Sequence, residues 1–102
     1  MGRSENPTGG VTGQVNVTTS GTPVQMPNIV IPPGIIVTIK AKHANTGRIT
    51  SGFSSAAALN TGTSYYDIGG KDDFILLQND NLSRLWIDAT VSGEGVEYIF
   101  ER

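Results

Sequence analysis

The side chain best suited to chemistry is His43, the single histidine of this 102-residue chain, which contains no cysteine. A histidine can serve as the base for a serine nucleophile, but no serine stands in the Gly-x-Ser-x-Gly turn that exposes such a nucleophile. Without cysteine there is no thiolate nucleophile, no thiolate ligand for zinc and no disulfide. We therefore predict that the protein is not an enzyme and that His43 lies near the end of a turn.

A second group of chemically capable residues is acidic and lies around a glycine turn, namely Asp67, Asp72, Asp73 and Asp80. Carboxylates gathered in loops can bind calcium, but the spacing here does not match the calcium loop of an EF-hand. Acidic residues beside a glycine turn are usually solvated. We expect no metal and no cofactor. A calcium-dependent adhesion domain stays as a minor alternative and requires Asp67, Asp72 and Asp73 to converge.

Aromatic side chains offer a binding hypothesis. Trp86 alternates with Leu85 and Ile87, so it faces away from the apolar side of its strand, and Tyr65 and Tyr66 add two more rings. Exposed aromatic rings can stack on a sugar or fill a protein interface. The alternative is that Trp86 packs under the second face of the sheet or under the loop of Tyr65 and Tyr66. We take these three residues as a candidate interface with a subunit or a ligand.

Composition excludes several classes of function. Seven basic residues stand against nine acidic residues, for a formal net charge of -2, so the chain has no basic surface for capturing nucleic acid. The longest apolar runs are far too short to cross a membrane, and residues 1–10 lack the apolar core of a secretion signal. Thirteen glycines, five prolines and many threonines favour short strands joined by tight turns over helices.

Alternation of apolar and polar residues locates the strands. It is clearest over residues 35–42, 85–91 and 96–101, where every second residue is apolar. Residues 74–77, Phe-Ile-Leu-Leu, are apolar on both faces, which is typical of a buried strand. In all we expect seven to eight short strands in a single-domain, all-β, antiparallel sandwich, either similar to a jelly roll or a small barrel.

Turn-forming residues separate these strands. Asn45-Thr46-Gly47 and Ser92–Gly95 each predict a hairpin turn, because such residues tolerate positive φ. After the first turn, Ile49 and Phe53 share one parity and are expected to face the core. Residues 54–64 are small and polar and are compatible with a loop, a poor strand or a short helical turn. The alanines of this stretch would permit close approach of another subunit.

The first ten residues differ from the rest. They are polar, contain Pro7 and a pair of glycines, and have no periodicity, so we assign residues 1–10 to a flexible arm and residues 11–102 to the sandwich domain. Such an arm can become ordered on a partner. We name Arg3, Glu5, Asn6 and Pro7 as its candidate docking residues. An expression remnant or an unbound tail would have the same composition.

From about residue 30 to residue 101 the chain resembles a small module of tailed-phage virion proteins. The resemblance lies in an ordered succession of turn motifs within "PPGIIVTIKAKHANTGRITSGFSSA", "IGGKDDFILL" and "LSRLWIDATVSGEGVEYIFE". Modules of this type occur as capsid decoration, or cement, proteins and at the ends of head fibres. The succession is more specific than any of its single motifs, and it does not cover the N-terminal arm.

The resemblance implies a structural role without catalysis. The chain would be made in the cytoplasm of a bacterial host and would lie on the outside of the capsid in the virion. It would dock on the major capsid protein as a homo-oligomer, with a trimer favoured over a dimer because shells offer many local threefold sites. The alternative is a carbohydrate-binding or host-recognition module of a virion fibre. Neither reading involves nucleic acid or a membrane.

Overall fold

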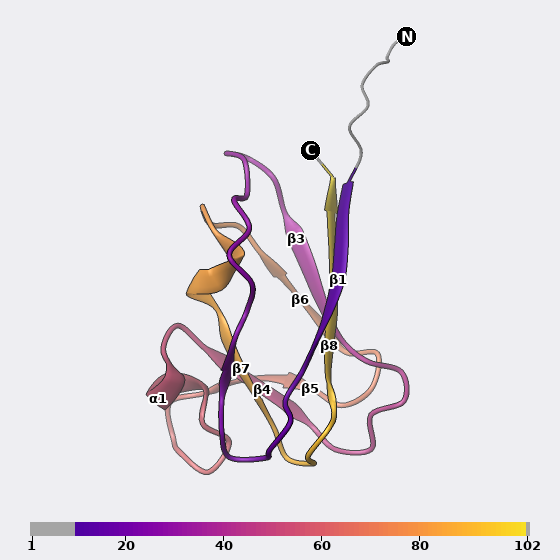
Figure 1. The fold of residues 1–102 in the computed structure, drawn as a ribbon, viewed down its shortest axis with the longest axis vertical. Helices are drawn as coiled ribbons and strands as arrows, with labels where there is room; N and C mark the ends of the chain where they lie inside the picture. Colours follow the sequence, from indigo (N-terminus) through magenta and orange to yellow (C-terminus); the bar gives the residue numbers. More distant parts are fainter. Residues whose placement is uncertain (1–9, 102) are drawn as a thin grey trace, which may run out of the picture.

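The computed structural model describes residues 10–101, which form two packed antiparallel sheets of four strands each (Figure 1). The first sheet has the order β1-β8-β3-β6, with β1 at Gly10–Asn16, β8 at Gly95–Glu101, β3 at Val37–Ala41 and β6 at Phe74–Leu77. The second sheet has the order β2-β7-β4-β5, with β2 at Val24–Gln25, β7 at Trp86–Ala89, β4 at Ile49–Gly52 and β5 at Tyr66–Gly69. The expected sandwich is confirmed.

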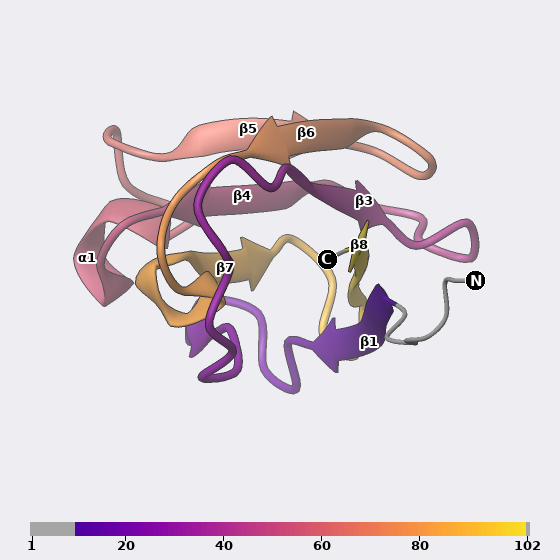
Figure 2. The same cartoon turned by 90° about the horizontal axis from the view of Figure 1, so that it is seen from above.

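The strand pairing is that of a jelly roll. Within the sheets β1 pairs with β8, β2 with β7, β3 with β6 and β4 with β5, all antiparallel. Such nested pairs arise when one long antiparallel ribbon rolls up. Pairing of β3 with β8 joins two of these pairs into the first sheet, and pairing of β4 with β7 joins the other two into the second sheet. Seen from above, β5 and β6 lie together at one side of the sandwich and β1 lies at the other (Figure 2).

The two predicted hairpins are wrong. β3 and β4, joined through Asn45-Thr46-Gly47, lie in different sheets, and so do β7 and β8, joined through Ser92–Gly95. Each turn carries the chain from one sheet to the other. In the second turn Gly93 has a positive φ of 88°, as expected, whereas Asn45, Thr46 and Gly47 of the first turn do not have positive φ. A tight turn thus reverses the chain without fixing which strands it pairs.

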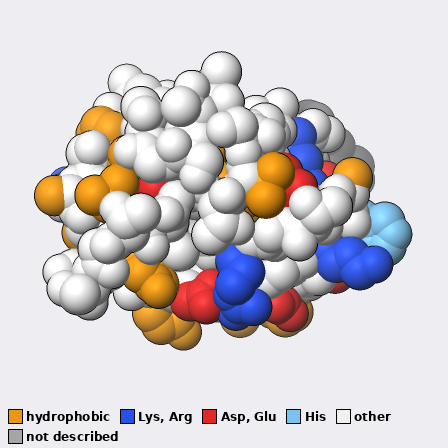
Figure 3. Space-filling model, turned by 90° about the horizontal axis from the view of Figure 1, so that it is seen from below, with side chains coloured by type: hydrophobic (Ala, Val, Ile, Leu, Met, Phe, Trp, Pro, Cys, Tyr) orange, Lys and Arg blue, Asp and Glu red, His pale blue; other side chains and the backbone are white. Residues whose placement is uncertain are grey.

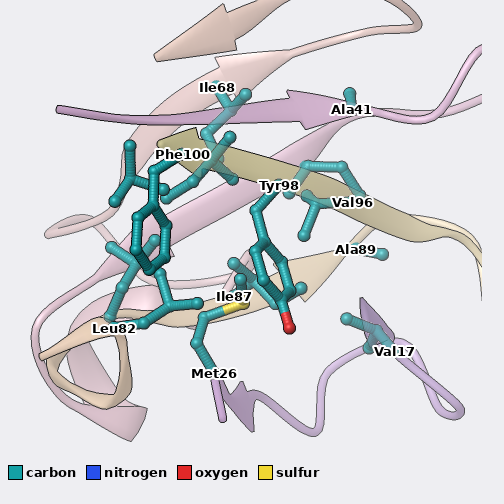
Figure 4. Close-up of a cluster of buried hydrophobic side chains, with 14 of the residues drawn as sticks. Val17, Met26, Ala41, Ile68, Leu82, Ile87, Ala89, Val96, Tyr98 and Phe100 are labelled. Carbon is teal, nitrogen blue, oxygen red and sulfur yellow. The ribbon is translucent and has the colours of Figure 1, made fainter. Parts of the chain in front are cut away.

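Side chains from both sheets meet in one apolar core (Figure 4). Along β8 the inward positions are Val96, Tyr98 and Phe100, which are buried, while Glu97, Ile99 and Glu101 between and after them are half-buried or exposed. Ile87 and Met26 oppose them from the second sheet, and both are buried. Burial of a large aliphatic or aromatic side chain stabilises a fold by about 1.5–3 kcal/mol. The period of two in the sequence therefore builds the core directly.

Two short helical turns complete the described residues. The α1 helix, Ser55–Ala58, begins at Ser54, whose hydroxyl accepts a hydrogen bond from the Ala57 N–H at 3.0 Å. A 3-10 turn, η1, spans Leu82–Arg84 before β7. The open choice for residues 54–64 thus resolves as a helical turn followed by loop. Neither of these two helical turns is long and apolar enough to cross a membrane.

The β6 strand differs from its prediction. Its sequence is apolar on both faces, but the strand lies at the edge of its sheet, and Phe74 and Leu76 are 57% and 61% exposed. Ile75 and Leu77 face the other way and pack against the core. An apolar pair therefore occupies the solvent side of an edge strand.

Candidate functional site

The His43 side chain lies at the molecular surface within a network of charged groups. Its Nδ1 atom is 2.7 Å from Asp72 Oδ2, and Lys40 Nζ is 3.7 Å from Asp72 Oδ1 and 2.9 Å from Glu97 Oε1. The hydrogen bond from His43 lowers the pKa of Asp72, and the hydrogen bond to Glu97 raises the pKa of Lys40. His43 follows the end of β3, as expected, and its contact in this network is a carboxylate.

The aspartates around the glycine turn each have a different partner. Asp67 pairs with Arg48 at 2.8 Å, Asp80 pairs with Arg84, and Asp73 accepts a hydrogen bond from the Gly70 N–H at 3.0 Å. Within residues 10–101 no group of three His, Cys, Asp or Glu side chains is arranged to hold a metal ion. The convergence of Asp67, Asp72 and Asp73 that a calcium site requires is therefore not found there.

Charges of both signs share the end of the molecule that carries the turns between the sheets. Figure 3 shows Lys or Arg side chains directly beside Asp or Glu side chains on this face, with the single histidine at its margin. Interspersed charges of this kind solvate a surface and pair locally, and they do not create the one-sided field that attracts a charged polymer.

Two acidic residues serve the fold. Glu94 accepts hydrogen bonds from the Thr46 N–H at 2.7 Å, the Thr46 hydroxyl at 2.8 Å and the Gly47 N–H at 2.9 Å. Partial burial by itself would raise the pKa of Glu94, but these hydrogen bonds outweigh it and lower the pKa. The turn before β8 is thereby fastened to the turn after β3.

Asp88 is fully buried although it points away from the core of the sandwich. Its carboxylate accepts hydrogen bonds from the backbone N–H groups of Gly21 at 3.0 Å, Asn60 at 2.8 Å and Ala89 at 2.8 Å. The loops that follow β1 and α1 therefore meet over β7 and cover this residue. A carboxylate enclosed in this way holds loops together and is not available to a substrate.

The three predicted aromatic residues lie in different places. Tyr66 is 67% exposed and lines a groove beside β6, whereas half-buried Trp86 lines a hollow on the outside of the second sheet. Tyr65 is 37% exposed and lines neither of them. The aromatic residue that connects the groove with the hollow is Phe53, which is 67% exposed and lines both.

Phe53 was expected in the core because it shares its parity with Ile49. The β4 strand ends at Gly52, however, so the alternation stops one residue before Phe53 and the chain turns toward α1. The Gly-Phe-Ser-Ser sequence, with a helix cap at Ser54, is the signal that places this ring outside the strand.

The groove beside β6 is apolar. It has a volume of about 470 Å³ and is lined by all four residues of β6 on one side and by Ser51, Gly52, Phe53 and Tyr66 on the other, with buried Leu85 at its base. Because β5 and β6 are the edge strands of their sheets, this groove lies along the open side of the sandwich.

The hollow at Trp86 is polar by contrast. Its volume is about 680 Å³, and the lining side chains apart from Trp86 and Phe53 are Gln25, Asp80, Asn81, Ser83 and Arg84. Arg84 and Asp80 pair with each other across four residues, and the Gln25 amide donates to the Ser83 carbonyl at 2.9 Å. An aromatic ring surrounded by amides and a charged pair provides both a stacking surface and hydrogen-bonding groups.

The candidate docking residues Arg3, Glu5, Asn6 and Pro7 lie outside the described residues. Comparison of the chain with protein-family models, curated proteins and solved structures found no match. The fold class therefore rests on the architecture of the chain itself. The chain is a jelly-roll sandwich with an apolar groove on its open side and a polar hollow next to the groove.

Proposed function

We propose that this chain is a non-enzymatic structural protein of a phage virion, which decorates and stabilises the capsid shell by oligomerising and docking on the major capsid protein. The observation that carries the proposal is the group of exposed apolar side chains around the groove beside β6, namely Phe53, Tyr66, Phe74 and Leu76, each 57–67% exposed. Apolar side chains gathered on one surface of a small domain mark an interface with another protein.

Two further observations support this proposal. The jelly roll is a common architecture of viral capsid domains and lectins, although a fold alone does not determine a function. The sequence resemblance to phage decoration and head-fibre modules covers the segment from β3 to β8. The turn motifs that carry the resemblance are the same turns that Asn45 and Glu94 fasten together.

The test is co-sedimentation with capsid shells of the phage that encodes the chain, assembled from the major capsid protein. We expect saturable binding at a fixed ratio of decoration protein to shell subunit, and a higher melting temperature of the decorated shell. A chain lacking residues 1–9, which leaves β1 whole, measures the contribution of the arm residues Arg3, Glu5, Asn6 and Pro7. Absence of saturable binding by the full chain would overturn the proposal.

The hollow at Trp86 favours a second candidate function, which is recognition of a carbohydrate by a virion fibre. The Trp86 ring can stack on the apolar face of a sugar while Gln25, Asn81 and Arg84 hydrogen-bond its hydroxyl groups. We expect Trp86→Ala to abolish any glycan binding seen on an array of bacterial surface glycans. Tyr65→Ala is the matched control, because Tyr65 lies outside the hollow, and equal loss in both variants would contradict this assignment.

A further inference from the structure

The edge of the first sheet at β6 is open. Among the described strands β6 has one neighbour, β3, and the groove described above follows its other side. The register from Val37 opposite Leu77 to Lys40 opposite Phe74 is continuous, so no bulge twists the edge away. The strand contains no proline, lysine or other charged residue. Proteins usually protect exposed edge strands with such features, because an unprotected edge pairs with another strand.

The hydrogen-bonding groups on the free side of β6 can be assigned. The Ala41 N–H donates to the Asp73 carbonyl at 2.9 Å, so the backbone carbonyl of Asp73 points toward β3. Along an antiparallel strand the backbone N–H and C=O groups of successive residues point to alternate sides. The N–H and C=O groups of Ile75 and Leu77 therefore also point toward β3. The N–H and C=O groups of Phe74 and Leu76 point to the free edge. These are the two residues whose side chains are exposed on the outer face of the sheet.

We propose that β6 pairs with β6 of a second copy of this chain, antiparallel around a twofold axis at Ile75. In this register Phe74 of each copy lies opposite Leu76 of the other, and these residues exchange four backbone hydrogen bonds. The two Ile75 residues face each other as a pair without mutual hydrogen bonds. The two sheets then continue into one sheet of eight strands.

The pairing register follows from the faces of the strand and from charge. Outward side chains must lie opposite outward side chains, which restricts the register to steps of two residues. A shift by one step places Asp72 opposite Asp80 of the second copy, and the opposite shift places Leu76 opposite Asp72. The first juxtaposes like charges and the second exposes an apolar side chain to a carboxylate. The register centred on Ile75 has neither defect.

The size of the surface fits a second copy. An aromatic side chain offers about 150–250 Å², so the exposed parts of Phe53, Tyr66, Phe74 and Leu76 together amount to roughly 500 Å² per copy. A standard protein interface buries about 800 Å² per partner. The paired β6 backbones and the half-buried Ile75 and Leu77, which line the same groove, add to this area. Because the same strand is used by both copies, the contact closes on itself and yields a dimer, not the trimer favoured from the sequence and not a fibre.

The first experiment is sedimentation equilibrium of the full chain over a range of concentrations. We expect a monomer–dimer equilibrium that Leu76→Pro shifts toward monomer by at least tenfold in the dissociation constant. The Leu76 N–H points to the free edge, so proline at this position removes no bond to β3. Ile99→Lys is the matched control, because Ile99 is exposed on the same face but belongs to β8, away from the edge. A circular dichroism spectrum verifies that each variant is folded.

The second experiment tests the register. The chain has no cysteine, so Ile75→Cys introduces a single thiol at the proposed twofold axis. Two residues facing each other in this type of pair have Cα atoms about 4.5 Å apart, within the range of a disulfide. We expect Ile75→Cys to form a covalent dimer under mild oxidation and Phe74→Cys, which would face Leu76, to form much less.

Three results would overturn the proposal. They are a monomer at every concentration, an oligomer that Leu76→Pro leaves unchanged, and equal cross-linking of Ile75→Cys and Phe74→Cys. The inference specifies the oligomerising part of the proposed function, and its failure is distinguishable from a failure to dock on the capsid because self-association is measured without shells.

Discussion

The side chain of Asn45 and the backbone of Gly95 exchange two hydrogen bonds in the interior of the protein. Asn45 Nδ2 donates to the Gly95 carbonyl at 2.8 Å, and Asn45 Oδ1 accepts from the Gly95 N–H at 3.4 Å. Both residues are buried, and they belong to the two turns that carry the chain between the sheets. The side-chain amide thus adds to the pairing of β3 with β8 at the start of β8, where the Lys42 N–H also donates to the Gly95 carbonyl at 3.1 Å.

We predict that Asn45→Ala lowers the free energy of unfolding by about 2 kcal/mol, because it leaves the buried Gly95 N–H without its acceptor and removes one of the two donors to the Gly95 carbonyl, the other being the Lys42 N–H. Urea unfolding followed by tryptophan fluorescence measures the change. Asn28→Ala is the control, because Asn28 is exposed and its Oδ1 accepts a hydrogen bond from the side-chain amide of Asn81 at the surface. A loss of the same size in both variants would show that the Asn45 contact has no special weight.

Glu94 predicts a dependence of stability on pH. Its pKa in the folded protein is below the ordinary value of 4.5, because the hydrogen bonds from Gly47 and Thr46 outweigh the effect of burial. A carboxyl group of lowered pKa stabilises the fold above its unfolded pKa, and this contribution is lost as the pH falls through the folded pKa. Glu94→Gln should therefore be less stable than the wild type at pH 7, and the difference should narrow below pH 4.5.

Thermal unfolding of both proteins between pH 7 and pH 3 measures this effect. The matched variant is Glu101→Gln, at the exposed end of β8, which should follow the wild type throughout. A constant difference between Glu94→Gln and the wild type over the whole range would mean that the carboxylate charge is not what fastens the turn.

Asp88 gives the largest predicted effect. Asp88→Asn replaces one acceptor oxygen by an NH₂ group, which then faces the backbone N–H of Gly21 or Asn60 inside the protein. We expect a loss of about 2–3 kcal/mol, because hydrogen bonds to a charged, buried acceptor are among the strongest. The midpoint of urea unfolding should fall without a change in the slope.

Asp67→Asn is the comparison for Asp88. Asp67 is also an aspartate on the second sheet, but it pairs with Arg48 at the surface, where such pairs contribute little. Its unfolding midpoint should change only slightly. If Asp67→Asn were as destabilising as Asp88→Asn, burial of the acceptor would not be the cause.

The sequence was sufficient to predict the sandwich because several strands have their apolar residues at a spacing of two, as β8 illustrates with Val96, Tyr98 and Phe100. It was not sufficient to predict which strands pair. Asn45-Thr46-Gly47 is compatible with a hairpin and with a turn between sheets, since both require only a sharp reversal. The choice depends on partners such as Gly95, fifty residues away in the chain.

The candidate site was harder to predict for a related reason. The Phe-Ile-Leu-Leu sequence of β6 is equally compatible with a central strand and with an edge strand that another protein covers. Periodicity indicates which residues share a face but not what lies over it, so it could not separate the surroundings of Tyr66 from those of Trp86. Phe53 was misplaced because one glycine ended its strand.

The small residues of the second sheet provide the last prediction. The alanines after Phe53, which were expected to permit close approach of another subunit, form α1 itself, and this helix packs on Gly52 of β4. A Cβ atom at Gly52 would lie 2.6 Å from the Ala57 carbonyl carbon and 2.8 Å from the Ala58 nitrogen. The helix cannot simply move away, because Ala58 is buried and its carbonyl accepts a hydrogen bond from the Thr50 hydroxyl at 2.7 Å. Gly52→Ala should therefore cost about 1–3 kcal/mol of stability, as other overpacked sites do.

Gly70→Ala is the control, since the nearest atom to its added methyl would be 3.8 Å away, and its unfolding midpoint should remain close to that of the wild type. Similar midpoints for the two variants would mean that α1 is loosely attached and that the close contact with Gly52 has no role in the fold.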